Sequence, residues 1–225
     1  MDNHRCQHCG VRDQPTRQWR GVSADQRREE RRAQLIEAGL EVIGNHGWAA
    51  ATVRTVCRAA GLTERYFYQA FPDRDGLLIA VYDHVVAEGV AVVLDAIEHA
   101  PHDFASTVRA VITAGVDMVT ADPRKGRLLA IEATAHQPLL RRRQEAMRDQ
   151  AGLIARLSAK QFGGRADDVD AHINALAGVG ALVEVGSAYL DGRLPLSRER
   201  LIESLTGIVL ACAGVSSATQ SSAPS

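Results

Sequence analysis

The sequence predicts an all-α protein with about nine helices, and three observations support this fold class. Apolar residues recur at helical spacing through most of the chain. Breaks that contain Gly, Pro or Asp separate these segments. No segment alternates apolar and polar residues for long enough to predict a strand. The helices are expected at residues 23–46, 52–60, 64–71, 75–99, 103–121, 123–135, 138–162, 167–191 and 197–214.

The composition is ordinary for a soluble globular protein of one or two domains, with 225 residues, 46% hydrophobic and 24% charged. The net charge is −1, and the first 75 residues hold twelve Arg against ten acidic residues. This excess is slight, so a nucleic-acid partner has to be argued from motifs. The N-terminus does not resemble a signal peptide, and the apolar runs are shorter than the roughly 20 residues that span a bilayer. A cytoplasmic location without membrane contact is therefore expected.

The stretch from residue 52 to residue 78 predicts two short helices joined by a tight turn. Thr52 can cap the first helix through its hydroxyl, and Gly61 can end it in the left-handed conformation. Thr63 can cap the second helix, and Pro72 stops it. Two short helices around a Gly-containing turn form a helix-turn-helix unit, whose second helix enters the DNA major groove. The chain thus contains a candidate DNA-binding unit.

The side chains of the second short helix divide by role. Phe67 and Phe71, at positions i and i+4, are expected in the core. Arg65 can donate bidentate hydrogen bonds to guanine O6 and N7, and Gln69 can bind adenine N6 and N7 or a phosphate. An ion pair with a nearby carboxylate is the alternative for Arg65. For Tyr66, contact with DNA and packing against the first helix both remain open.

Four arginines crowd the first turns of the helix expected at 23–46, among them Arg28. One interpretation is contact with DNA phosphates near the start of this helix. The alternative is a solvated face on which these arginines pair with Glu29 and Glu30.

Two segments outside the helices are expected to lack fixed structure. Residues 1–22 form a flexible arm without apolar periodicity, and residues 215–225 form a polar tail of small residues. Cys6 and Cys9 in the arm have C-x2-C spacing, but no second ligand pair follows them. We therefore predict no metal and no cofactor. A metal- or redox-responsive regulator that uses this arm is an alternative function.

The order of these motifs resembles the DNA-binding domain of the TetR family of transcriptional regulators. The resemblance covers about residues 24–80 and rests on Thr-Val-x-x-Val-x-x-x-Ala-Gly-Leu-Thr, Phe-Tyr-x-x-Phe and Pro-Asp-Arg-Asp-x-Leu-Leu. It implies a homodimer with a three-helix helix-turn-helix domain, here residues 23–74. It also implies a helical ligand-binding and dimerisation domain, here residues 75–214. The implied function is a repressor that binds a palindromic operator and is released by a small molecule.

The resemblance also assigns roles to single residues. Tyr68 occupies the position of a phosphate-contacting tyrosine, and Arg74 stands where a lysine usually contacts the DNA backbone. Arg65 departs from the small residue often found at its position, which leaves the operator sequence open. The DNA-binding residues expected from sequence are therefore Arg28, Thr52, Thr63, Arg65, Tyr66, Tyr68, Gln69 and Arg74.

The C-terminal half has the composition expected for a helical pairing surface. Residues 176–190 are apolar almost all round and rich in Gly and Ala, so that helix backbones can approach closely. We expect the helices at 167–191 and 197–214 to form the dimer surface. An intramolecular core helix is the alternative.

A ligand cavity is expected among the helices between about 80 and 190. Glu132 and His136, at i and i+4, could hold a ligand jointly or form an ion pair with each other. No G-x-S-x-G, H-E-x-x-H or phosphate-binding Gly loop occurs, so an enzyme built on a helical bundle is a disfavoured alternative. The candidate ligand-binding residues are Met118, Glu132, His136, Met147, Gln150 and Asn174.

Overall fold

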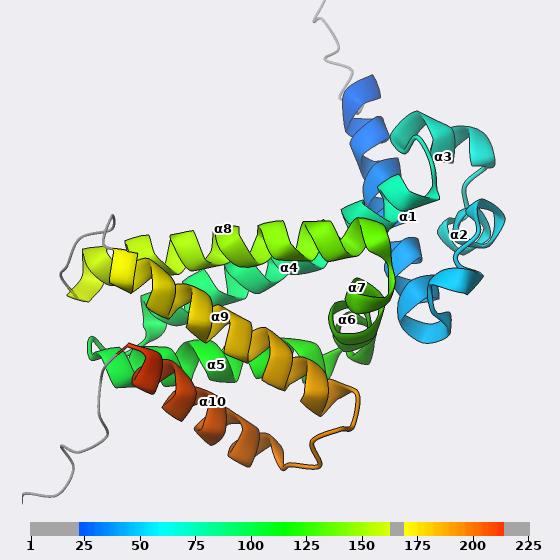
Figure 1. The fold of residues 1–225 in the computed structure, drawn as a ribbon. Coiled ribbons are helices and arrows are strands. Elements are labelled where there is room, and N and C mark those ends of the chain that lie inside the picture. Colours follow the sequence, from blue (N-terminus) through cyan, green and yellow to red (C-terminus); the bar gives the residue numbers. More distant parts are fainter. Residues whose placement is uncertain (1–22, 163–168, 214–225) are drawn as a thin grey trace, which may run out of the picture.

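The computed structural model describes residues 23–162 and 169–213, and these residues form helices without any strand (Figure 1). The expectations for the arm, with Cys6 and Cys9, and for the tail at 215–225 fall outside the described residues. The helices are α1 (Ala24–His46), η1 (Trp48–Ala50), α2 (Val53–Ala60), α3 (Glu64–Ala70), α4 (Arg74–His99), α5 (Phe104–Ala121), α6 (Pro123–Arg127), η2 (Leu128–Glu132), α7 (Ala133–Ala135), α8 (Gln137–Phe162), α9 (Val169–Leu190) and α10 (Arg198–Cys212).

The predicted all-α fold is confirmed. The segments α6, η2 and α7 follow one another without a break. Counted as one, they bring the α-helices of the described residues to nine. The helix predicted at 123–135 is therefore present, but η2 within it is π-helical. A π-helical turn bonds each N–H to the carbonyl five residues earlier, which shifts the faces of the residues that follow.

The N-terminal domain packs α1, α2 and α3 around one core. Its fully buried side chains include Leu35 and Ile43 of α1, Val56 of α2 and Phe67 of α3. The Ser23 hydroxyl caps α1 by accepting the N–H of Gln26 at 3.0 Å. The domain lies at one end of the molecule, beside the start of α4 (Figure 1).

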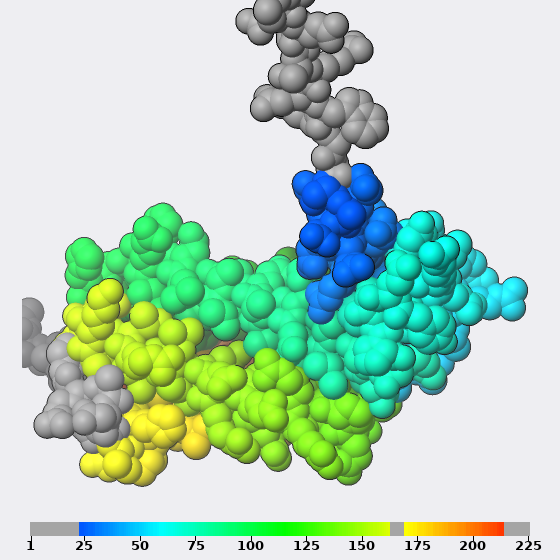
Figure 2. Space-filling view, turned by 90° about the horizontal axis from the view of Figure 1, so that it is seen from above, coloured from blue at the N-terminus to red at the C-terminus, as the bar shows by residue number. Residues whose placement is uncertain are grey.

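Helix α4 runs from the N-terminal domain into the C-terminal helices. Near its start, Leu77, Leu78 and Val81 are fully buried in the same core as α1. The two helices approach closely at Gly39, where an added Cβ would lie 2.8 Å from Val81 Cγ2. Further along, α4 packs against α5 and α8, and Figure 2 shows α4 and α8 side by side.

A second core lies between α5 and α10. Ile112 and Val116 of α5 meet Leu201, Ile202 and Leu205 of α10, and all five side chains are buried. Helix α9 packs against both α8 and α10. The C-terminal domain is therefore a helical bundle attached to the N-terminal domain through α1, α4 and α6.

Three of these helices, α4, α5 and α9, are long and apolar enough to cross a membrane by length and composition alone. The sequence alone did not predict such segments, because no single apolar run is long. In the structure the three helices pack together in the C-terminal bundle and line a common cavity. Their apolar character therefore has an explanation within the fold.

Helix α6 fixes the junction between the two domains. Its Arg124 donates to Glu37 at 3.0 Å and to Glu41 at 2.7 Å, both on α1. Arg124 also binds Asp122, and these hydrogen bonds lower the pKa of the Asp122 carboxyl below its usual value. The backbones meet at Gly44, where an added Cβ would lie only 2.4 Å from Arg124 Cβ. The junction therefore combines ion pairs with a contact that only glycine permits.

Candidate DNA-binding surface and interior cavity

Helix α3 rests on two phenylalanines and presents its other face to solvent. Phe67 is fully buried, and its ring centre lies 5.7 Å from that of Phe71. Arg65, Tyr68 and Gln69 are exposed, and Tyr68 keeps 59% of its surface accessible. The outer face of α3 thus carries one cation, one amide and one phenol that are free to meet a partner.

Two arginines of α1 hold aromatic rings of the α3 region. The guanidinium carbon of Arg31 lies 4.6 Å from the centre of the Tyr66 ring, and that of Arg32 lies 5.3 Å from the centre of Phe71. These are cation–π distances. Tyr66 is half-buried beneath Arg31, which agrees with packing against the first helix. Arg28 is exposed on the first turns of α1.

The two predicted caps differ in the structure. The Thr52 hydroxyl accepts the N–H of Thr55 at 3.1 Å, as predicted. Thr63 stands at the N-cap of α3, but its side chain makes no cap hydrogen bond, which corrects the prediction. Its backbone carbonyl accepts the N–H of Tyr66 instead. Gly61 ends α2 in the left-handed conformation, at φ 66°.

Arg74 folds back onto the N-terminal domain. Its Nε donates to the Ala51 carbonyl and its second terminal nitrogen to the Trp48 carbonyl, both at 2.9 Å. The guanidinium carbon lies 4.3 Å from the centre of the Trp48 ring. Arg74 therefore joins the start of α4 to η1. The guanidinium already has partners within the chain, although the family resemblance assigns it a DNA phosphate.

We expect Arg74→Met to destabilise the DNA-free protein by about 1–3 kcal/mol, because two backbone carbonyls lose a charged donor. Arg74→Lys should recover only part of this loss, since an ammonium group lacks the planar fork. Urea unfolding followed by circular dichroism measures both variants. If Arg74 served only as a phosphate contact, Arg74→Met would leave the free energy of unfolding unchanged.

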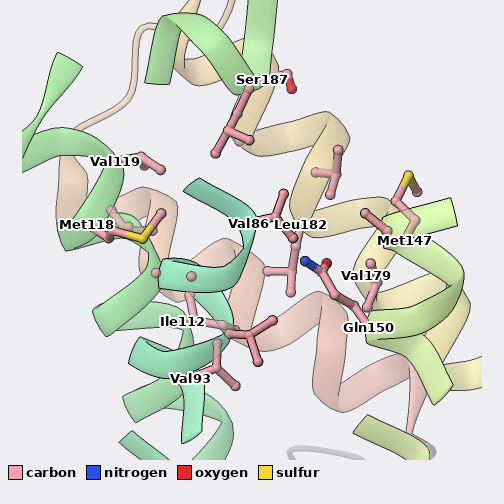
Figure 3. A pocket seen from close by; sticks show the side chains of 18 of the residues that line it. Val86, Val93, Ile112, Met118, Val119, Met147, Gln150, Val179, Leu182 and Ser187 are labelled. Carbon is pink, nitrogen blue, oxygen red and sulfur yellow. The ribbon is translucent and has the colours of Figure 1, made fainter. Parts of the chain in front are cut away.

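The C-terminal bundle encloses a cavity of about 270 Å³. Its wall comes from α4, α5, α8, α9 and α10, and Leu129 of η2 completes it. Most lining side chains are aliphatic, and Figure 3 shows Val86, Val93, Ile112, Val179 and Leu182 around the space. Pockets for small molecules are typically apolar and lie between helices of bundles.

Three of the six sequence-predicted ligand residues line this cavity: Met118, Met147 and Gln150. Glu132, His136 and Asn174 do not line it, which corrects those expectations. Asn174 is exposed on α9. That helix is apolar almost all round, so its inward face could not be read from its sequence.

Glu132 lies instead at the domain junction, with only 4% of its surface exposed. Its carboxylate accepts the Trp48 N–H at 3.3 Å, and it pairs with Arg127 at 3.3 Å and with His136 at 3.0 Å. The predicted i, i+4 pair with His136 is thus present. It holds η1 against η2 rather than a ligand.

Sequence reasoning missed the polar groups that do line the cavity. These are Tyr82 of α4, Arg143 of α8, and Ser187 and Tyr189 of α9. The only sequence signal that could have identified Arg143 is its spacing from Gln150. It stands seven residues before Gln150 and therefore lies on the same face of α8.

The fold and the α2–α3 unit define a helix-turn-helix protein with a C-terminal helical bundle. Residues 35–81 match the family model described as "Bacterial regulatory proteins, tetR family". This match assigns the N-terminal domain to the TetR family, as the resemblance of its motifs implied.

Curated relatives agree with this assignment over part of their length. The chain is 37% identical over 119 residues to the HTH-type transcriptional regulator BetI of Paraburkholderia phytofirmans. It is 34% identical over the same length to BetI of Burkholderia cenocepacia. Each match covers 52% of this chain and 61% of the relative.

Solved structures extend the likeness of the fold to both domains. A TetR-family regulator from Syntrophomonas wolfei superposes with a TM-score of 0.69 at 11% identity, over 85% of this chain and 99% of that one. The fatty acid degradation regulator FadR of Bacillus halodurans gives 0.66 at 18% identity, covering 80% and 94%. FadR of Bacillus subtilis, solved in complex with stearoyl-CoA, gives 0.63 at 14% identity, covering 82% and 98%.

Proposed function

We propose that the protein is a transcriptional repressor that binds a palindromic operator as a homodimer and is released by a small molecule. The outer face of α3 carries this proposal. Arg65, Tyr68 and Gln69 project from a short helix that the buried Phe67 holds in place. Arg65 and Gln69 have the donor geometry for guanine and adenine edges, whereas Tyr68 suits a phosphate. A protein of this kind acts on chromosomal DNA, so we propose a cytoplasmic location.

Two copies of α3 are needed to read a palindrome, and α9 with α10 supplies the surface proposed to pair them. Val169, Ile173 and Leu176 of α9 expose 70%, 55% and 38% of their surfaces. A second copy would remove these apolar groups from water. Related by a two-fold axis, the paired modules would meet half-sites about 34 Å apart or a multiple of that distance.

The cavity supports the proposal of a small-molecule effector. B. subtilis FadR, which shares this fold, was solved with stearoyl-CoA. Here, α4 and η2 contribute Val86 and Leu129 to the cavity wall and also reach the N-terminal domain. A ligand that favours a non-binding arrangement by about 1.4 kcal/mol would weaken operator binding tenfold.

Selection of random duplexes on the purified protein tests this function. We expect enrichment of an inverted repeat, measured affinity in the nanomolar range, and binding that weakens steeply as salt rises. Fluorescence anisotropy with the selected duplex and a scrambled duplex of equal length gives the specificity ratio. Equal affinity for the two duplexes would refute sequence-specific regulation.

A further inference from the structure

The cavity wall contains a single charged side chain among the described residues, Arg143 of α8. Tyr82, Gln150, Ser187 and Tyr189 add polar atoms, and aliphatic groups form most of the rest. The polar groups therefore occupy a small part of an otherwise apolar surface. Such a lining suits a largely apolar ligand that carries a polar group.

Arg143 has a hydrogen-bond donor without a partner. Its Nε is buried, and it is the only buried side-chain nitrogen or oxygen in the described part of the chain that lacks a hydrogen bond. A terminal nitrogen lies 3.7 Å from Glu184, beyond hydrogen-bond distance. The Glu184 side chain is 68% exposed, so solvent screens this pair.

An unpaired buried N–H costs about 1–3 kcal/mol. Within an otherwise satisfied structure, such a group points to a missing acceptor. Glu184 does not supply that acceptor, because it faces a different nitrogen at long range. A ligand oxygen in the cavity would satisfy Nε and balance the guanidinium charge together.

The groups near Arg143 favour the same end of the cavity for an anion. Tyr82 also lines the wall, and burial raises its pKa to about 12, with a smaller opposing effect of Arg143. The phenol is therefore neutral at physiological pH and can donate its hydrogen. Gln150 lies on the same face of α8, and Figure 3 shows it among the side chains that line the cavity.

We propose that the effector is an amphipathic monoanion, with a carboxylate on Arg143 and a hydrocarbon body along the aliphatic wall. This inference rests on the proposed function, since it concerns the ligand of the same cavity. A carboxylate matches the planar fork of a guanidinium. A cation at this position would be repelled, and a dianionic phosphate would lose more hydration energy than one arginine returns.

Calorimetric titration with three ligands of one chain length tests the charge requirement. The probes are octanoate, octan-1-ol and octylamine. We expect octanoate to bind about ten- to a hundredfold more tightly than octan-1-ol, as a charged hydrogen bond would give. Octylamine should bind most weakly. Equal binding of octanoate and octan-1-ol, or binding of neither, would overturn the inference.

Two arginines on one helix provide a matched pair of variants. Arg143→Met should reduce octanoate binding to the level of octan-1-ol and leave octan-1-ol binding unchanged. Arg141→Met removes an exposed charge from the same helix and should keep the wild-type preference. An Arg143→Met protein that still prefers octanoate would refute the assignment. Arg143→Gln, which retains polarity without charge, serves if the methionine variant does not fold.

Operator binding, measured separately, distinguishes this inference from the proposed function. If the protein binds DNA sequence-specifically but does not prefer octanoate, the proposed ligand class is refuted and the proposed function stands. If the preference for octanoate depends on Arg143 but the protein shows no sequence-specific DNA binding, the proposed ligand class stands and the proposed repressor function is refuted.

Discussion

Replacing both Arg65 and Tyr68 with alanine is expected to abolish specific operator binding and to leave the fold intact. Loss of a bidentate guanine contact at Arg65 alone should cost about 1–3 kcal/mol, roughly a five- to 150-fold loss of affinity. Loss of Tyr68 removes a phosphate contact and should weaken binding to all sequences equally. Fluorescence anisotropy on the selected operator and its single-base variants measures both effects.

The fold should tolerate these changes because both side chains are exposed. Arg109→Ala, an exposed arginine on α5, is the matched control for net charge and should leave the affinity unchanged. Circular dichroism and size-exclusion chromatography establish that the double variant keeps its helices and its oligomeric state. If its affinity for operator equals that of the wild type, α3 is not the recognition helix.

Replacing Phe67 with alanine is expected to destabilise the N-terminal domain by about 3–5 kcal/mol. The ring is fully buried and contacts Phe71, so the substitution leaves a cavity between α3 and α1. Urea unfolding of the DNA-free protein measures the loss. Operator affinity should fall as well, because α3 would no longer hold a fixed orientation.

Phe67→Leu serves as the graded control, since it keeps an apolar group at the site. It should cost less than half as much as the alanine substitution and retain measurable operator binding. A Phe67→Ala protein with wild-type stability would show that α3 is held by other contacts, such as those of Arg31 and Arg32 with the aromatic rings.

The fold and the helix-turn-helix could be predicted because their signals are local in sequence. Ser23 and Thr52 cap their helices through N–H groups three residues ahead. Gly61 takes the left-handed conformation that the turn requires, and Asp73 caps α4 through Gly76. Each of these interactions lies within one helical turn of its residue, so residue type and spacing suffice to predict it.

Interactions between distant segments were not predictable in the same way. The resemblance places Arg74 on DNA, but its side chain reaches carbonyls 23 and 26 residues earlier in the chain. Glu132 contacts Trp48 across 84 residues. The π-helical segment that ends at Glu132 carries no Gly or Pro to announce it, so a constant helical period does not show which way Glu132 and His136 face.

Some ligand-binding predictions were right and others wrong for a related reason. Met118, Met147 and Gln150 lie on amphipathic helices, on which the inward face can be inferred. Asn174 lies on α9, where apolar residues on every side conceal that face. Arg143 stands in a run of three arginines. Its spacing from Gln150 places it on the same face of α8, but the packed bundle is needed to show that this face lines the cavity.

In the proposed regulator, the length of α4 would turn small displacements at the cavity into larger ones at the DNA. The helix contains 26 residues, which at about 1.5 Å per residue gives a rod of roughly 39 Å. A tilt of about 5° would move one end of such a rod by about 3 Å, the length of one hydrogen bond. In a symmetric dimer both rods would tilt, and the separation of the two α3 helices would change by up to twice that distance. A ligand therefore need not deform either domain to disturb the fit between the two α3 helices and a fixed DNA helical repeat.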